Sequence, residues 1–319
     1  MIARLVGSEM CIRDRVNEPL VVDGIAIYQS SFGDGGSRLK FVGYPMQGAG
    51  RGTFAIDGTV GGSTPLAGTS SAADGEGLVV EFSDFRLMNI ENVTDASGKP
   101  DARGVVRKSL NETLKSHLGA AASTEREKAL RNVGPSVQYK LRDRNGQARE
   151  YNNYMVPVQL DGHSVFLAGM RESPNEPFRY LRIPADDQGS VADWMRLRAA
   201  LQDRAMRGEA ARRFALTSMP GADKTELRTQ LAKSALRALD LFAGASRSGP
   251  DSPPGGFTAI AAFLGKSVPA AEQQKAADVL LQILNGSMWE LWQLARAQDK
   301  LPVLPNSAQS GTFLQQSIN

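Results

Sequence analysis

Polar and apolar residues alternate along much of the first half of the chain, which is the period of a half-buried β-strand. Turn signals separate the alternating stretches: Asn145-Gly146 is the strongest short signal for a hairpin, and Asp161-Gly162 follows a second stretch. Because such turns join antiparallel neighbours, this part is predicted to be an antiparallel meander. Its strands are expected at 137–142, 154–160 and Val165–Met170.

The residues before this meander also predict strands. In the last of them Leu78, Val80 and Phe82 share one face, but Phe85 is out of phase, which indicates a bulge near Ser83-Asp84. A Gly/Ser-rich stretch at 61–77 is predicted to be a loop, and Glu112–Leu130 has a helical pattern. The earlier strands are expected at Leu20–Phe32, Arg38–Tyr44, Gly52–Val60 and Leu78–Ile90.

The period changes near Gln188 from that of strands to that of helices. Ser190 and Asp193 resemble a capping box, and apolar residues then recur at helical spacing from Val191 to Ala205. Asp223 and Glu226 mark another helix start, Ser248–Gly256 reads as a linker, and Pro269 is placed to open a third helix. The expected apolar stripes are Leu227, Leu231, Ala235 and Phe242, and then Val279, Leu280, Ile283, Leu284, Leu291 and Trp292.

The two periods together predict an α+β protein, with an N-terminal antiparallel, β-sandwich-like region followed by a C-terminal helical region. Hairpin signals recur without the helical crossovers of a parallel sheet, so two packed antiparallel sheets are expected. The regions are placed at 16–188 and 189–319. Residues 1–15 are set apart as a non-native tail, and the helical region is expected to be truncated before a missing transmembrane helix.

The ends of the chain support that division. GSEMCIRDR, within residues 1–15, resembles a translated sequencing-adapter read-through, and the alternative is a genuine irregular tail. Gly311–Asn319 stops inside an apolar pattern without a Gly or Pro stop signal, which suggests a piece of a longer protein. If residues 1–15 are adapter-derived, removing them should change stability by no more than about 0.5 kcal/mol.

Composition narrows the function classes. The net charge is +3, which is too balanced to predict nucleic-acid binding. No apolar run approaches the length of a membrane span. One cysteine and two histidines leave little for a Cys/His metal site or an internal disulfide.

Few residues in the sequence suggest catalysis or ligand binding. The GDGGS stretch at 33–37 lacks the lysine and the following helix of a phosphate loop, so a hairpin turn is expected. His117 and His163 could each ligate haem iron, although a lone turn histidine is more often solvated, and Met155 and Met170 are expected as core residues. No catalytic, cofactor-binding or metal-binding residue is assigned. Tryptophans are expected in core packing rather than against a porphyrin, at Trp194, Trp289 and Trp292.

One segment carries a family pattern. VNEPLVVDGIAIYQSSF at 16–32 resembles the ResB family of system II cytochrome c biogenesis proteins, and further matches lie at Tyr151–Val158, Gly169–Tyr180 and Leu284–Leu294. From the residues alone this segment would be read simply as a strand. The family-signature positions, with a structural or partner-docking role, are Asn17, Pro19, Leu20, Gly24, Tyr28, Gln29, Ser30, Ser31 and Phe32.

The resemblance implies a membrane protein with a large domain on the periplasmic side of the bacterial inner membrane. It implies a non-catalytic part in which haem is handled by the full-length complex, with no cofactor in this piece. The partners it implies are a ResC/CcsA-type membrane protein and apocytochrome c, with no nucleic acid. The alternatives from other classes are a free-standing extracytoplasmic β-sandwich binding or adhesion protein and a hydrolase with an unrecognised carboxylate site.

Overall fold

The computed structural model describes residues 36–46, 48–66, 77–92, 130–160, 162–245 and 255–318. It also gives the backbone of four short N-terminal strands. These are β1 (Ile2–Arg4) paired with β2 (Cys11–Arg13), and β3 (Leu20–Val22) paired with β4 (Ile25–Ile27). Several predictions fall on residues outside the described ranges. They are His117, the GDGG turn at 33–36 except Gly36, most of the helical pattern at 112–130 and most of the linker at 248–256.

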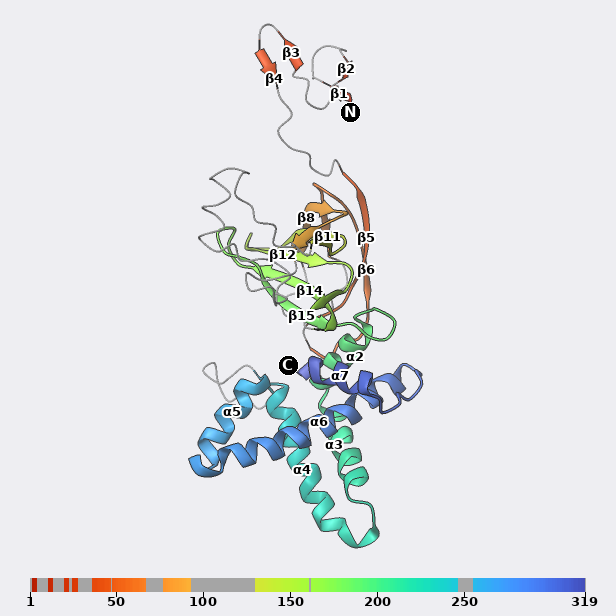
Figure 1. The fold of residues 1–319 in the computed structure, drawn as a ribbon, viewed down its shortest axis with the longest axis vertical. Coiled ribbons are helices and arrows are strands. Elements are labelled where there is room, and N and C mark those ends of the chain that lie inside the picture. Colours follow the sequence, from red (N-terminus) through yellow and green to blue (C-terminus); the bar gives the residue numbers. More distant parts are fainter. Residues whose placement is uncertain are drawn as a thin grey trace.

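The centre of the β region is a seven-stranded antiparallel sheet (Figure 1). Its strand order is β13-β14-β12-β11-β8-β7, and β15 pairs with the other edge of β14. The strands are β7 (Ser63–Pro65), β8 (Val79–Arg86), β11 (Ser136–Arg142), β12 (Ala148–Tyr154), β13 (Val158–Leu160), β14 (His163–Arg171) and β15 (Arg179–Pro184). A separate pair, β9 (Ile90–Asn92) with β10 (Leu130–Asn132), follows β8.

A two-stranded hairpin covers one face of this sheet. β5 (Arg38–Gly43) and β6 (Phe54–Thr59) pair along their whole length and run beside the sheet towards the helices (Figure 1). Leu39 and Val60 pack with Val80, Phe82 and Val137 in a buried cluster. We call this side of the seven-stranded sheet the apolar face. The opposite side carries the polar rows described below and is called the polar face, although a second buried cluster lies at one end of it, with Tyr154, Leu160, Val165 and Leu167. The expected sandwich-like packing of antiparallel strands, followed by helices, is therefore confirmed.

The predicted turns and bulge are also present. β11 and β12 join through Gly146, whose φ of 82° is the left-handed conformation that glycine accommodates, and Gly162 has a φ of 80° between β13 and β14. The register between β8 and β11 shifts so that Tyr139 opposes Phe82 and Gln138 opposes Asp84, which leaves Ser83 as the extra residue.

Other expectations about the strands were wrong in detail. The stretch at Leu20–Phe32 contains two short paired strands instead of one. The loop expected at 61–77 includes β7, because Ser63–Pro65 pairs with β8. Leu78–Ile90 is divided, since β8 ends at Arg86 and Ile90 begins β9. Leu130, expected in a helix, lies in β10.

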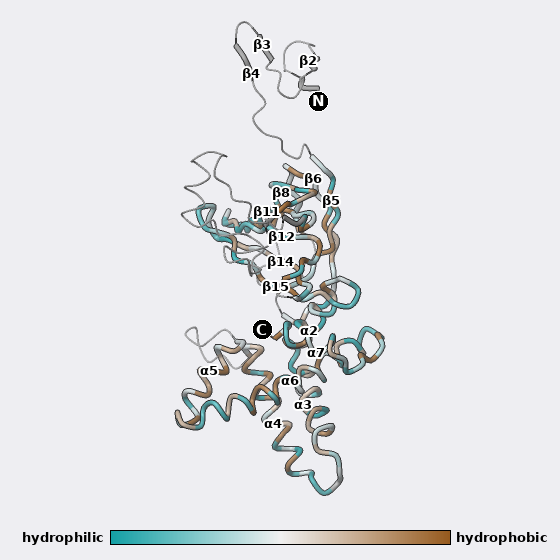
Figure 2. The backbone as a smooth tube through the Cα atoms, viewed as in Figure 1, coloured by the Kyte–Doolittle hydropathy of each residue, from teal (hydrophilic) through white to brown (hydrophobic). Residues whose placement is uncertain are grey.

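Six α-helices are described in the second half of the chain, gathered at one end of the β region (Figure 1). Polar and apolar residues are interspersed along each helix (Figure 2). The apolar sides of the helices form one core, which includes Leu284, Met288, Leu291 and Trp292. The helices are α2 (Ala192–Gln202), α3 (Arg204–Ser218), α4 (Thr225–Phe242), α5 (Gly256–Ser267), α6 (Gln273–Gln298) and α7 (Ala308–Ile318), with the short 3₁₀ turns η2 (Ala222–Lys224) and η3 (Ala270–Glu272).

The helices differ from the predicted apolar stripes at several positions. The helix expected through Ala205 breaks at Asp203, whose side chain accepts hydrogen bonds from the backbone of Ala205 and Met206 and so starts α3. Leu227 and Val279, expected in the core, are 53% and 51% exposed. Leu227 lies in the first turn of α4, and Val279 lies on the outer side of α6, since Ala276, Ala277 and Leu280 beside it pack against the core. Helix α5 was not expected.

The capping box expected at Ser190 and Asp193 is only half formed. Ser190 Oγ accepts a hydrogen bond from the Ala192 N–H at 3.1 Å, but the Asp193 side chain does not reach back to Ser190. Asp186 completes the cap: its carboxylate accepts from the Asp193 N–H at 3.3 Å, from the Ser190 N–H at 2.8 Å and from the Ser190 hydroxyl at 2.6 Å. Asp193 instead pairs with arginines, as described below. Within the described part of the chain, no helix has both the length and the apolar character needed to span a lipid bilayer.

Candidate functional site

Four charged residues form a row across the polar face, which we call the charged row: Glu81, Lys140, Glu150 and Arg171. Each is directly opposite the next on neighbouring strands, so their side chains share one face. Lys140 Nζ lies 3.0 Å from Glu150 Oε1, and Arg171 Nε donates to Glu150 Oε2 at 2.6 Å. Glu81 pairs bidentately with Arg142, at 2.7 and 3.0 Å.

Glu150 is the most buried member of this row, with its side chain 8% exposed. Burial alone would raise the pKa of the Glu150 carboxyl, but the hydrogen bonds and charges of Lys140 and Arg171 outweigh it and hold that pKa below its ordinary value. Arg171 also stacks on Phe178, with its guanidinium carbon 4.4 Å from the ring centroid. The cations of the charged row are thus committed to partners within the sheet.

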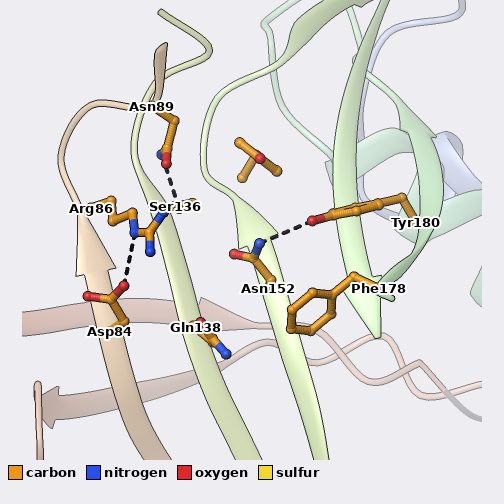
Figure 3. A pocket seen from close by; sticks show the side chains of 9 residues that line it. Asp84, Arg86, Asn89, Ser136, Gln138, Asn152, Phe178 and Tyr180 are labelled. Atoms are coloured by element: carbon orange, nitrogen blue, oxygen red, sulfur yellow. Dashed lines mark hydrogen bonds and ion pairs between the residues drawn. The ribbon is translucent and has the colours of Figure 1, made fainter. Parts of the chain in front are cut away.

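The next row along the polar face is uncharged over most of its length, and we call it the amide row: Asp84, Gln138, Asn152, Gly169 and Tyr180. The register places these residues opposite one another across five successive strands, β8, β11, β12, β14 and β15. All of them except Gly169 line a recess with a volume of about 280 Å³. The remaining lining residues are Arg86, Asn89, Ser136, Tyr154 and Phe178 (Figure 3).

Gly169 lets the Tyr180 side chain close this end of the recess. A Cβ at position 169 would lie 2.7 Å from Tyr180 Cε1, so only glycine leaves room for the ring over the strand. The ring then reaches Asn152, whose Nδ2 donates to the Tyr180 hydroxyl at 3.1 Å (Figure 3). The aromatic ring of Tyr180 therefore lies beside the side-chain amide of Asn152 in the recess.

The opposite end of the recess depends on the bulge at Ser83. Because one extra residue is inserted there, Phe85 falls on the apolar face while Asp84 and Arg86 fall on the polar face. Arg86 Nε donates to Asp84 Oδ2 at 3.0 Å (Figure 3). The recess thus presents a paired Asp–Arg, three carboxamides, hydroxyls and rings.

Hydrogen bonding within the recess is incomplete. Asn89 Nδ2 donates to the Gly134 carbonyl at 2.8 Å and to Ser136 Oγ at 3.0 Å, so both of those buried side chains are engaged. The side chain of Gln138 has no hydrogen bond with any described residue, and Asn152 uses only its Nδ2. A carboxamide supplies two donors and an acceptor, so the recess can bind a ligand that offers both.

A second polar cluster joins the β region to the helices. Arg198 of α2 donates to the carbonyls of Pro45, Met46 and Gly48, at 2.8, 2.8 and 3.2 Å, in the loop between β5 and β6. Burial lowers the pKa of the Arg198 guanidinium, and its Nε is buried without a hydrogen-bond partner. The loop is thus held by one cation that has no carboxylate partner among the described residues.

Arg51, at the other side of the same loop, contacts α6. It donates to the Ala295 carbonyl at 2.7 Å and pairs with Asp299 at 3.2 Å, and it also contacts Gln298. Arg196 bridges Asp299 and Asp193, both at 2.7 Å, and Arg296 pairs with Asp193 as well. We call the contacts of Arg51, Asp193, Arg196, Arg198, Arg296 and Asp299 the seam.

The structure places few of the residues singled out from the sequence at either cluster. His163 is exposed at the start of β14, and Met155 is partly buried against the apolar face. Trp292 is buried and stacks on Phe313 with centroids 4.6 Å apart, and Trp289 packs edge-on against it, so the core assignment of these two is confirmed. Of the family-signature positions only Leu20, in β3, has a described backbone.

The recess was not predicted as a site from the sequence. Two of the segments that resemble the family, Tyr151–Val158 and Gly169–Tyr180, nevertheless contain four of its lining residues, Asn152, Tyr154, Phe178 and Tyr180. A second signal was the position of Gln138 and Asn152 at polar positions of alternating strands. Their side-by-side position depends on register across strands distant in sequence, which the local pattern does not specify. The described residues contain no group of three or more His, Cys, Asp or Glu side chains placed to hold a metal.

The sheet, the polar recess and the helical region describe a two-region α+β protein without an evident catalytic centre among its described residues. Comparison with known proteins defines its family: the ResB-like family matches residues 13–309, most of the chain. The chain belongs to the ResB-like family. No curated protein and no solved structure matches it. Membership indicates involvement in cytochrome c biogenesis and a membrane-associated protein.

Proposed function

We propose that this chain is the extracytoplasmic part of a cytochrome c assembly protein. In this proposal it lies on the periplasmic side of the bacterial inner membrane. It supports haem delivery and attachment to apocytochrome c together with a ResC/CcsA-type membrane partner. The observation that carries the proposal is the family match over residues 13–309.

The contribution of this chain is positional. Its described polar clusters have a structural rather than a catalytic role in this proposal. The charges of the seam and of the charged row are neutralised or hydrogen-bonded within the protein. The sequence holds one cysteine, Cys11, so it contains no cysteine pair for reducing an apocytochrome by thiol exchange. Haem handling is assigned to the membrane part of the complex.

The test is complementation. A bacterium lacking its own ResB-type gene receives the full-length gene of this protein, and covalently attached haem is measured on its c-type cytochromes. We expect attachment to be restored by the intact gene and lost when residues 36–318 are removed. Restoration by a gene without this region contradicts the proposal and favours a binding or adhesion role.

A second test concerns haem itself. We propose that the isolated chain does not bind haem tightly, because a stable site needs a strong axial donor in an apolar pocket, and His163 is exposed. Titration of haem into the purified chain, followed at the Soret band, should give no saturable one-to-one binding at submicromolar affinity. Such binding, abolished by His163→Ala or His117→Ala, would make that histidine the ligand.

A further inference from the structure

Three aliphatic side chains beside the recess face solvent. Leu87, Met88 and Ile90 are 69%, 65% and 65% exposed, and we call them the aliphatic rim. Single exposed apolar residues are ordinary, but three within four positions of the chain are a local concentration, and such concentrations are typical of interaction sites.

The rim is held in this orientation by the residue between its members. Asn89 is buried, and its side chain points into the recess and donates to Gly134 and Ser136 (Figure 3). Its backbone N–H donates to Asn132 Oδ1 at 3.2 Å, and its carbonyl accepts from the Val133 N–H at 2.9 Å. Because four hydrogen bonds anchor Asn89, the outward position of its neighbours is fixed by the fold.

The neighbouring strand edge also has backbone groups that no described residue bonds. β7 pairs with β8 only along Val79–Glu81, and Gly61 and Gly62 bond to Phe82. Past Phe82, the outer edge of β8 has no backbone hydrogen bond to any strand within the described ranges. Extended peptides are recognised at such edges through their main chain, with nearby side chains giving specificity.

The chemistry of the surface excludes several ligand classes. An anionic ligand requires a free cation, but Arg86, Lys140 and Arg171 each have a carboxylate partner. A sugar would use the carboxamides and rings but would leave the aliphatic rim uncovered. An extended peptide contacts both the recess and the aliphatic rim. Its backbone amides can form hydrogen bonds with Gln138 and Asn152, and its apolar side chains can cover the rim.

We propose that the recess and the aliphatic rim bind an extended, uncharged polypeptide segment with aliphatic side chains. The inference rests on the proposed function only for its probe, apocytochrome c, which is unfolded because it lacks haem. Holocytochrome c has the same polypeptide in a folded state and is the matched control.

The experiment measures binding of fluorescently labelled apocytochrome c to the purified 319-residue chain by anisotropy. We expect saturable binding that persists in about 0.5 M salt, where exposed charges are screened, and no binding of holocytochrome c. Met88→Ser with Leu87→Ser, and separately Gln138→Ala, should each weaken binding at least about tenfold, as interface hot spots do. Leu216→Ser is the control, because Leu216 is 57% exposed at the end of α3, away from the recess.

Several outcomes overturn the inference. They are no binding of apocytochrome c, equal binding of holocytochrome c, or unchanged binding by the rim and Gln138 variants when circular dichroism shows them folded. A photocrosslinker at position 88 that reacts only with the chain's own residues 93–129 also overturns it. Failure here leaves the proposed function intact if complementation restores haem attachment, whereas failed complementation counts against the function alone.

Discussion

Gly58 determines how closely β6 approaches the sheet. A Cβ at this position would lie 2.0 Å from the ring of Phe82, which is buried and stacks on Phe41 with centroids 5.4 Å apart. We expect Gly58→Ala to lower the free energy of unfolding by about 1–3 kcal/mol, the usual cost of overpacking. Urea denaturation measures it, with Gly52→Ala as the control because a Cβ there meets nothing within 4 Å. Equal effects of the two substitutions would contradict this account.

Glu150 makes stability depend on pH. Its folded-state pKa lies below the ordinary value, so its contribution is present at neutral pH and is lost as the pH falls through that lowered pKa. We expect Glu150→Gln to destabilise the protein by about 1–3 kcal/mol at pH 7, because Lys140 and Arg171 lose their shared carboxylate.

The measurement is thermal or urea unfolding of both proteins at pH 7 and near pH 3. The difference should shrink as the pH is lowered, because wild-type Glu150 becomes protonated as the pH falls through its lowered pKa. Glu81→Gln serves as the comparison and should have a smaller effect, because the Glu81 side chain is 33% exposed. A difference that is constant with pH would mean that packing, not charge, is responsible.

At the scale of elements, the bulge in β8 decides which residues reach the recess. Deleting Ser83 removes the extra residue and leaves a regular strand, in which Phe82 still opposes Tyr139 and Asp84 still opposes Gln138, so both faces are kept. Inserting one alanine after Val80 instead adds a residue without a partner in β11, so the residues on one side of the insertion must exchange faces. We expect the insertion to cost several kcal/mol, on the order of a lost core side chain, and the Ser83 deletion to cost less. Chemical denaturation of both variants tests this, and a deletion as costly as the insertion would show that the bulge itself stabilises β8.

Local signals in the sequence were sufficient for the turns and for this bulge. Asn145-Gly146 and the phase change before Phe85 depend only on neighbouring residues, and both were predicted. The helix break at Asp203 had an equally local signal, a capping residue before a new turn, but it lay inside a continuing apolar period that hid it.

Non-local geometry could not be predicted. Leu227 has the right spacing for a core position, yet it is exposed because α4 continues past the helices that would cover it. The recess requires Gln138, Asn152 and Tyr180 to align across strands, and that alignment follows from the pairing of β12 with β14 and of β14 with β15. Neither pairing can be derived from the alternating pattern of one strand.

At the scale of the whole molecule, the seam couples the two regions. The loop between β5 and β6 is held by Arg198 on α2 and by Arg51 against α6, while the hairpin itself packs on the sheet. Combining Arg51→Ala and Arg198→Ala should therefore release the loop and turn a shared unfolding transition into two. Differential scanning calorimetry measures this, with Arg212→Ala, an exposed α3 position, as the control. A single transition in the double variant would locate the coupling elsewhere.

The pair formed by β9 and β10 has a consequence for chain length. Asn92 lies opposite Leu130, so the ends of the segment between them are held side by side by the strands themselves. The entropy lost on closing a flexible loop grows only logarithmically, by about 0.6 kcal/mol for each doubling of its length. A flexible stretch inserted between these two strands would therefore add little thermodynamic cost, which makes this junction a suitable place for an inserted reporter domain.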